Sequence, residues 1–430
     1  MTHQSANARP VPAATEPAAR PEPSPILPLV GTQPAGPFAA AKARIAAVVD
    51  ANRTEILALS HRIHANPEPA FEEVQAAGWV AEAIRARGFA VEHPAGSLAT
   101  AVRGRLRGGR AVEAGGEGPR IGILAEYDAL PGLGHGCGHN TMAASGVGAA
   151  IALAAVAPEL PGEIVFLGTP AEERGSGKAI MLDDGLFEGL DAVLLYHPSD
   201  ATHVTCGLLV SEDVHVTFHG LQAHAASDPW EGRNALDAMI LLFSSVGLWR
   251  QQLRPDARIH GIIVEGGTAA NIIPERTLAW FMVRSPDEAE YERMRVRFED
   301  LCRAAALATG CTVEVVFSGR ASTMRNNMVL ADRFGANLAA YGVIAGPRPD
   351  NLGSSDMGNV SQVVPTIHPC VAICSAGVAS HSIEFRDAAG LPYADDVTLL
   401  VATVVAQTAY ELFADPVLVK AAWREFRAGA

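Results

Sequence analysis

Side chains able to bind a metal follow three apolar segments of the sequence. Residues 121–125, 164–168 and 192–196 each have the composition of a buried strand. In open α/β sheets the ligand crevice lies outside the carboxyl ends of the strands, so side chains that follow separate strands converge there. This layout is typical of a metal-dependent hydrolase. The polar residues are Glu126, Asp128, Cys137 and His139 after the first segment, Glu172 and Glu173 after the second, and His197 after the third.

The first of these loops contains a cysteine and a histidine two residues apart, Cys137 and His139, flanked by glycines. Glycines allow a close approach of the backbone, so both side chains can face one cation where the loop enters a helix. Thiolate and imidazole together favour zinc, manganese, cobalt or nickel over calcium or magnesium. The pair by itself is also compatible with a buried structural cysteine, or with a nucleophilic thiol beside a histidine.

Two adjacent carboxylates, Glu172 and Glu173, follow the pattern of a buried strand and a tight turn over residues 165–170. Adjacent side chains in a loop need not point the same way, so one can bind a metal while the other holds a proton. Metal-assisted hydrolysis requires both a ligand and a general base beside the activated water. The alternative is a solvated surface pair, which is less natural directly after a buried strand.

Five short motifs resemble those of the M20 metallopeptidases, and most closely those of the aminoacylase and amidohydrolase branch. This branch includes aminobenzoyl-glutamate hydrolases and auxin-conjugate hydrolases. Asn140 follows the second of the paired ligand candidates, as in the subgroup resembling β-alanyl-lysine dipeptidases. The resemblance covers residues 39–413. The motifs are His-Arg-Ile-His-Ala-Asn-Pro-Glu at residues 61–68, Asp-Ala-Leu-Pro at 128–131, Cys-Gly-His at 137–139, Pro-Ala-Glu-Glu at 170–173 and His-Pro at 197–198.

The resemblance implies roles for individual residues. Glu172 matches the general base, and Asp128 matches the carboxylate that orients a metal ligand. Two divalent ions, Mn²⁺ or Zn²⁺, are expected per chain. His381 is the candidate for the last ligand, and His368 competes with it. The implied ligand set is Cys137 in the bridging place, His139, Glu173, His197 and His381.

The pattern of strands and helices predicts two domains. Helical patterns cover residues 39–59 and 75–87, and from residue 120 strands alternate with helices. This order indicates an α/β fold with a mixed, mostly parallel sheet flanked by helices. Farther along the chain the order becomes βαββαβ, the ferredoxin-like signature. The resemblance implies a zinc-peptidase-like catalytic domain over residues 38–208 and 322–430, with residues 209–321 as an inserted lid and dimerisation domain.

The inserted segment carries Gly-Leu-Gln-Ala-His-Ala-Ala at residues 220–226. In the family, the histidine that matches His224 stabilises the oxyanion, often in the active site of the partner subunit. A homodimer through this domain is therefore expected. Asn271 and Arg284 match positions that bind the substrate carboxylate or carbonyl. Without the resemblance, His224 would be an exposed loop histidine, and Arg284 could equally form a surface salt bridge.

Composition limits the class of protein. The 430 residues carry a net charge of −14, which disfavours nucleic acid and anionic membranes as partners. Six cysteines without a framework spacing favour a reduced compartment, so we expect the cytoplasm. Residues 1–37 are rich in proline and alanine, and we expect them to be disordered. We find no secretory signal and no stretch of ~20 apolar residues, so no membrane span is expected.

These observations predict hydrolysis of an amide C–N bond by metal-activated water, with Glu172 as general base. The expected small-molecule substrates are N-acyl amino acids, dipeptides or aromatic amides of the aminobenzoyl-glutamate kind. A first alternative is hydrolytic deamination of an anthranilate-like aromatic amine, which would release ammonia. A second is a metal-dependent binding protein without turnover. A third is a cysteine hydrolase that uses Cys137.

Overall fold

The structure is a computed structural model that describes residues 25–32, 36–114, 118–348 and 353–429. Most of the predicted disordered tail therefore lies outside the described residues. Within them, the backbone N–H of Leu27 donates to the carbonyl of Tyr341 at 2.9 Å. This bond attaches the segment that precedes the first helix to the body of the protein.

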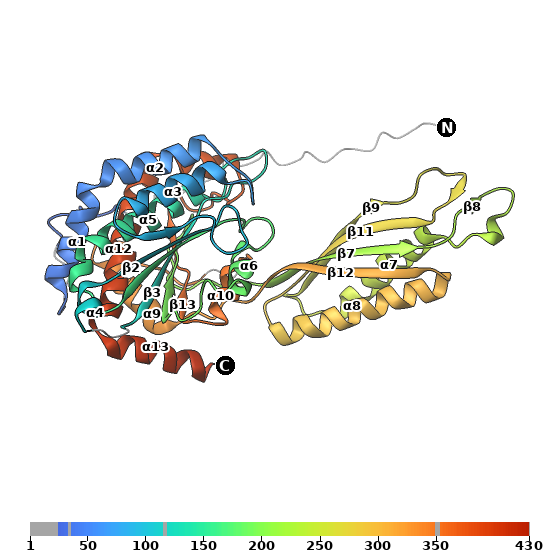
Figure 1. Ribbon diagram of the computed structural model, residues 1–430. Helices are drawn as coiled ribbons and strands as arrows, with labels where there is room; N and C mark the ends of the chain where they lie inside the picture. Colours follow the sequence, from blue (N-terminus) through green and yellow to red (C-terminus); the bar gives the residue numbers. More distant parts are fainter. Residues whose placement is uncertain (1–24, 33–35, 115–117, 349–352, 430) are drawn as a thin grey trace, which may run out of the picture.

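Two bodies, each built on its own sheet, make up the described structure (Figure 1). In the first body β3, β4, β5 and β13 run parallel. β2 pairs antiparallel with β4, and β1 pairs antiparallel with β2. The predicted α/β fold with a mostly parallel sheet is confirmed. The six strands lie in the order β1 (Ala90–Glu92), β2 (Val102–Arg107), β4 (Glu163–Thr169), β3 (Arg120–Glu126), β5 (Ala192–Leu194) and β13 (Thr366–Ile367).

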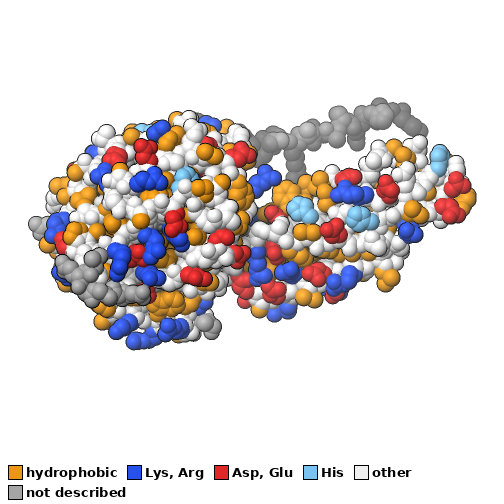
Figure 2. Space-filling view, viewed as in Figure 1, with side chains coloured by type: hydrophobic (Ala, Val, Ile, Leu, Met, Phe, Trp, Pro, Cys, Tyr) orange, Lys and Arg blue, Asp and Glu red, His pale blue; other side chains and the backbone are white. Residues whose placement is uncertain are grey.

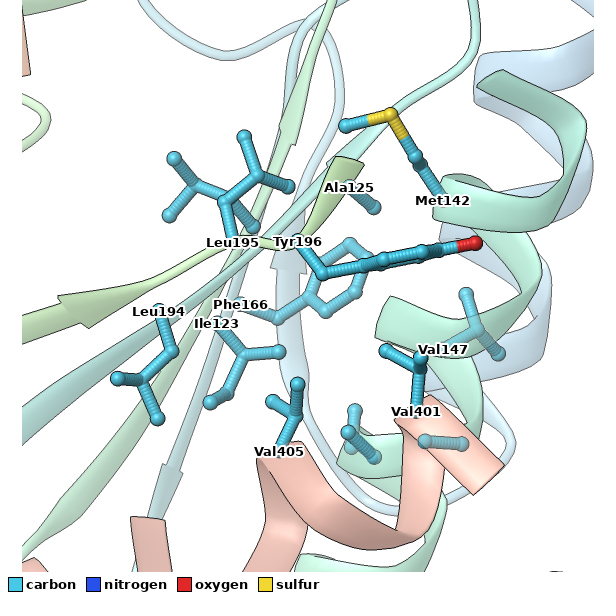
Figure 3. Close-up of a cluster of buried hydrophobic side chains, with 14 of the residues drawn as sticks. Ile123, Ala125, Met142, Val147, Phe166, Leu194, Leu195, Tyr196, Val401 and Val405 are labelled. Atoms are coloured by element: carbon cyan, nitrogen blue, oxygen red, sulfur yellow. The ribbon is translucent and has the colours of Figure 1, made fainter. Parts of the chain in front are cut away.

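The centre of the first body is an apolar core around β3 and β4. Every residue of β4 is buried, and β3 is buried after its first residue. This is the pattern of strands covered on both faces, for which hydrophobic runs are required. Figure 3 shows Val147 of α5 (His139–Val156) with Val401 and Val405 of α12 (Pro392–Ala414) packed near Ile123 of β3 and Phe166 of β4.

Helices α5 and α12 are long and apolar enough to cross a membrane, by length and composition alone. Each helix contains an apolar stretch of 18 residues, of which 83% is buried inside the protein in α5 and 89% in α12. A helix that is hydrophobic on all sides is typical of the core of a large protein. The prediction that no segment is long and apolar enough to cross a membrane is therefore wrong. The two helices pack together at the centre of the first body, so they need apolar residues on all sides.

The single helix predicted over residues 39–59 is also wrong, because Asn52 divides it. Its side chain donates to the carbonyl of Val48 at 2.7 Å, and its own carbonyl accepts from the N–H of Ile56 at 3.1 Å. An asparagine that bonds the local backbone competes with helix continuation. The helices of the first body besides α5 and α12 are α1 (Ala39–Ala51), α2 (Arg53–Ala65), α3 (Val74–Arg85), α4 (Gly109–Ala114), α6 (Gly177–Asp183), α9 (Met328–Ala339), α10 (Met357–Ser361), α11 (Ile383–Ala388) and α13 (Pro416–Ala428).

The second body has a four-stranded antiparallel sheet and two helices, α7 (Ala235–Trp249) and α8 (Glu288–Thr309). Burial alternates along its central strands, as in a sheet with helices on one face. Phe218, Phe281 and Phe298 form the centre of its core. The strands lie in the order β12 (Thr312–Ala321), β7 (Val210–His219), β11 (Arg276–Ser285) and β9 (Arg258–Glu265), and with the two helices they follow the chain as βαββαβ.

Two small pairs of strands lie outside the main sheets. β8 (Ala223–His224) pairs with β10 (Ile272–Ile273) at the end of the second body that is far from the first (Figure 1). β6 (His197–Ser199) pairs in parallel with β14 (Cys370–Ala372) within the first body. Short 3₁₀ helices occur at Ala157–Glu159, Pro229–Glu231 and Arg250–Gln252.

Candidate active site

The loop between β3 and α5 brings Cys137 and His139 to the carboxyl end of the parallel sheet. Gly138, which precedes α5, has a left-handed φ of 76°. A Cβ atom at this position would lie 2.8 Å from Cγ of Pro198, next to His197. Glycine is therefore required here, because only glycine lets the loop adopt this conformation and approach β6 so closely.

Two groups of potential metal ligands share one residue, Cys137. The first group is Cys137, His139 and His197, and the second is Cys137, Glu173 and His381. Within each group the ligand atoms all lie within 4.8 Å of one another. The structure thus brings together all five predicted ligands, with the thiol in the central place that the resemblance implies for a bridging ligand.

Asp128 orients two of these residues. Its Oδ1 lies 3.0 Å from Nδ1 of His139, and its Oδ2 accepts from the backbone N–H of Glu173 at 2.9 Å. A carboxylate on Nδ1 leaves the other ring nitrogen free for a metal. Nε2 of His139 and Oε1 of Glu173 are buried and make no well-aligned hydrogen bond among the described residues, although each faces a group of opposite charge at 3.3 and 3.4 Å. A divalent cation would satisfy both atoms, so the donor set fits a metal pair.

The structure distinguishes the two candidates for the last ligand. His381 has a φ of 62°, and its backbone N–H donates to the carbonyl of Gly136 at 2.9 Å. Its Nε2 lies 3.4 Å from Oε1 of Glu173. His368 is buried with its ring centroid 5.5 Å from that of His197, and it belongs to neither ligand group. The geometry therefore favours His381.

Glu172 occupies the place expected of a general base. One of its carboxylate oxygens lies within 4.8 Å of ligand atoms of both Glu126 and His139. Burial raises the pKa of Glu172 well above its ordinary value, and the nearby carboxylates of Glu126 and Glu173 raise it further. A carboxylate with a raised pKa accepts a proton more readily near neutral pH, which is what base catalysis needs.

A buried ion network behind the site was not predicted from the sequence. Nζ of Lys178 lies 2.5 Å from Oε1 of Glu126 and 2.6 Å from Oδ1 of Asp356, and all three side chains are buried. The other Glu126 oxygen lies 3.3 Å from Nε2 of His139. Burial lowers the pKa of Lys178, but the carboxylates of Asp356 and Glu126 raise it by more, so the lysine stays charged. In the sequence Lys178 cannot be distinguished from a surface lysine, because Asp356 is 178 residues away.

His224 and Asn271, which were predicted from the second body, do not reach this site within one chain. His224 and Asn271 are both exposed and lie together, since the N–H of Ala225 donates to the carbonyl of Asn271 at 3.0 Å. They belong to the tip formed by β8 and β10, at the far end of the second body (Figure 1). Arg284 is half-buried near the other end of β11, and its Nε has no hydrogen-bond partner in the described structure.

Comparison with known proteins agrees with this geometry. Residues 122–402 match the model of peptidase family M20/M25/M40. The Xaa-Arg dipeptidase of Mus musculus is 38% identical over 419 residues, which cover 92% of this chain and 94% of the relative. A p-aminobenzoyl-glutamate hydrolase polypeptide of Escherichia coli (strain K12) is 30% identical, over 68% of this chain and 64% of that relative.

Solved structures share the fold. An aminobenzoyl-glutamate utilization protein from Klebsiella pneumoniae superposes with a TM-score of 0.67 and 18% identity, over 84% of this chain and 96% of that one. A dinuclear metal binding peptidase of the M20 family from Bacillus subtilis gives a TM-score of 0.64 and 20% identity, over 85% and 99%. The family model and the 38% identical relative confirm the resemblance found in the sequence motifs. The chain belongs to peptidase family M20/M25/M40 and is a metal-dependent amidohydrolase.

Proposed function

We propose that this enzyme hydrolyses dipeptides or N-acyl amino acids, with a preference for a basic residue on the C-terminal side of the scissile amide. The reaction is supported by one observation above all, the two ligand groups that share Cys137 beside the carboxylate of Glu172. The substrate preference is supported by the Xaa-Arg dipeptidase relative, which aligns with 92% of the chain. The net charge of −14 also favours the approach of a cationic substrate over a dianionic one such as aminobenzoyl-glutamate.

The proposed roles of the residues follow from their positions. A pair of Mn²⁺ or Zn²⁺ ions held by the five ligands would supply an acidified water and a Lewis acid for the carbonyl. Glu172 removes a proton from the attacking water and then delivers that proton to the departing nitrogen. Asp128 holds His139 and Glu173 in place.

A second copy of the chain would complete the site. β9 is an edge strand, and its Ile262, Ile263 and Val264 are exposed by 58%, 42% and 54%. Hydrophobic side chains are visible on the surface of this body (Figure 2). An exposed apolar edge strand is a natural place for pairing with another chain, and a twofold axis would place the same strand on both sides. Such a homodimer would allow His224 of one subunit to stabilise the oxyanion in the other.

Two residues of the second body would then recognise substrate. Asn271 lies beside His224 and would contact the substrate carboxylate or carbonyl from the same subunit. Arg284 would supply a positive charge for the carboxylate. All six cysteines are free, which supports the cytoplasm as the proposed compartment.

The test is a substrate panel with metal analysis. We would measure the metal content of the purified protein, and then the release of amino acid and of ammonia from Ala-Arg, Ala-Glu, N-acetyl-arginine, aminobenzoyl-glutamate and anthranilate. We expect two divalent ions per chain and a kcat/KM for Ala-Arg about tenfold or more above that for Ala-Glu, the effect of one good charge pair. A chelator should abolish activity, and Mn²⁺ or Zn²⁺ should restore it.

Two outcomes would contradict the proposal. Release of ammonia from anthranilate without cleavage of any amide would establish the deaminase alternative. Equal rates for Ala-Arg and Ala-Glu would leave the amidohydrolase reaction intact but exclude the proposed preference for a basic residue.

A further inference from the structure

The loop that carries Glu172 and Glu173 has a backbone conformation that its sequence does not favour. Ala171, directly before the two carboxylates, has a φ of 59° and is fully buried. Ser176, at the end of the loop, has a φ of 54°. Left-handed conformations cost roughly 1–2 kcal/mol for residues with a Cβ atom and persist only where the surroundings impose them. Something outside the loop must therefore hold it.

A buried carboxylate contacts the loop at Ala171. Glu73, which precedes α3, is fully buried, and its Oε1 accepts from the backbone N–H of Ala171 at 2.8 Å. Its Oε2 accepts from the hydroxyl of Thr100 at 2.8 Å, and the carbonyl of Thr100 accepts from the hydroxyl of Tyr127 at 2.5 Å. Glu73 thus ties the start of the loop to a buried framework that does not include any of the proposed metal ligands.

The same segment contacts the loop a second time. Phe71 has a φ of 67°, and its ring lies against Gly175. A Cβ atom at Gly175 would be 2.5 Å from Cε2 of the ring, so only glycine fits beneath it. Residues 71 and 73 therefore hold the loop on either side of Glu172 and Glu173.

We propose that Glu73 is a positioning residue for the hydrolysis, which holds the peptide of Ala171 in its left-handed conformation and so directs Glu172 and Glu173 into the site. This inference rests on the proposed roles of those two carboxylates. Without Glu73, Ala171 relaxes to a negative φ, and both carboxylates that follow it turn away from their places. The expected loss falls on kcat and on metal binding through Glu173, and substrate affinity changes little.

The experiment compares Glu73→Ala with Glu72→Ala, which truncates the exposed neighbour in the same segment. We expect Glu73→Ala to lower kcat about 100-fold, the scale of a small misplacement of catalytic groups, with KM within about threefold. Metal content should fall from two ions toward one per chain. Glu72→Ala should match the wild type in all three measurements.

A double variant separates positioning from general stability. Glycine populates positive φ without a Cβ penalty, so adding Ala171→Gly to Glu73→Ala should restore kcat about tenfold and raise the metal content. Glu73→Gln retains an oxygen that can accept from Ala171, so it should stay within about fivefold of wild-type kcat. It also serves as the test if Glu73→Ala does not fold.

Several results would overturn the inference. Wild-type kcat and metal content in Glu73→Ala would do so, as would a loss in Glu73→Ala that Ala171→Gly leaves unchanged. A loss in Glu73→Gln as large as that expected for Glu73→Ala would show that the acceptor oxygen is not what matters. If Glu172→Gln is inactive while Glu73→Ala is fully active, the proposed base stands and only the role of Glu73 is wrong.

Discussion

The two bodies of this protein differ in where they place the polar residues expected to serve the site. At the carboxyl end of the parallel sheet, Glu126, Asp128 and His139 are buried. At the tip of the antiparallel body, His224 and Asn271 are exposed and lie outside the hydrophobic core of that body. Buried charges need partners and fixed geometry, whereas exposed groups cost little to place. We infer that the first body performs the chemistry and that the second delivers groups to a substrate from outside.

The sharpest test of this comparison is the base in the first body. Glu172→Gln should lower kcat about 10³-fold, because general base catalysis contributes on this scale, while metal content and the unfolding transition stay as in the wild type. Activity on the best substrate of the panel, metal analysis and urea unfolding would measure these quantities. A variant with near wild-type turnover would remove Glu172 from the mechanism.

Lys178 tests whether buried charge stabilises the first body. Lys178→Met leaves the carboxylates of Glu126 and Asp356 buried without their cation, so the free energy of unfolding should fall by about 3–5 kcal/mol. The control is Lys420→Met on the exposed side of α13. This substitution should change the free energy of unfolding by less than about 0.5 kcal/mol. Equal effects of the two substitutions in urea unfolding would contradict the importance of the network.

His224 tests whether the second body acts across a dimer. His224→Ala should lower kcat about 10²-fold through loss of an oxyanion donor, while the matched exposed histidine variant His219→Ala should not. Mixing Glu172→Gln with His224→Ala, each with about 1% of wild-type activity or less, should restore about a quarter of wild-type activity after subunit exchange. In half of the dimers one site then combines an intact base with an intact histidine. No recovery in subunits shown to exchange would mean that the histidine does not act in trans.

The smallest expected effect is a pH-dependent change in stability that arises from Glu73. Burial raises its pKa from 4.5 to about 7, so between these values the folded protein binds more protons than the unfolded chain. The contribution of this group to stability therefore falls as pH rises through this window. Glu73→Gln removes this titration. The free energy of unfolding of the variant should therefore rise by about 2–3 kcal/mol relative to that of the wild type as the pH increases from 4.5 to 7. Urea unfolding of the two metal-free proteins measures this difference in unfolding free energy. A difference that stays constant across the pH range would contradict the raised pKa of Glu73.

Much of the site was predictable because its motifs directly follow apolar strands. Residues 121–125 and 164–168 are hydrophobic enough to specify buried strands, and parallel strands end at one edge of a sheet. The convergence of Cys137 and Glu173 follows from this rule together with the motif spacing. Asn52 and the apolar helices α5 and α12 were misjudged, because a hydrophobic pattern does not show where a side chain bonds its own backbone or how deeply a helix is buried.

The sequence by itself determined the fold class, the family and the set of candidate ligands, since these depend on local patterns and on motifs whose order is specific. Only the tertiary structure brought His381 rather than His368 beside Glu173, paired Lys178 with Glu126 and Asp356, placed Glu73 against Ala171, and set His224 far from the site of its own chain. Each of these depends on contacts between residues distant in the sequence. Such contacts are selected by packing and by the pairing of buried charges, which leave no periodic pattern along the chain.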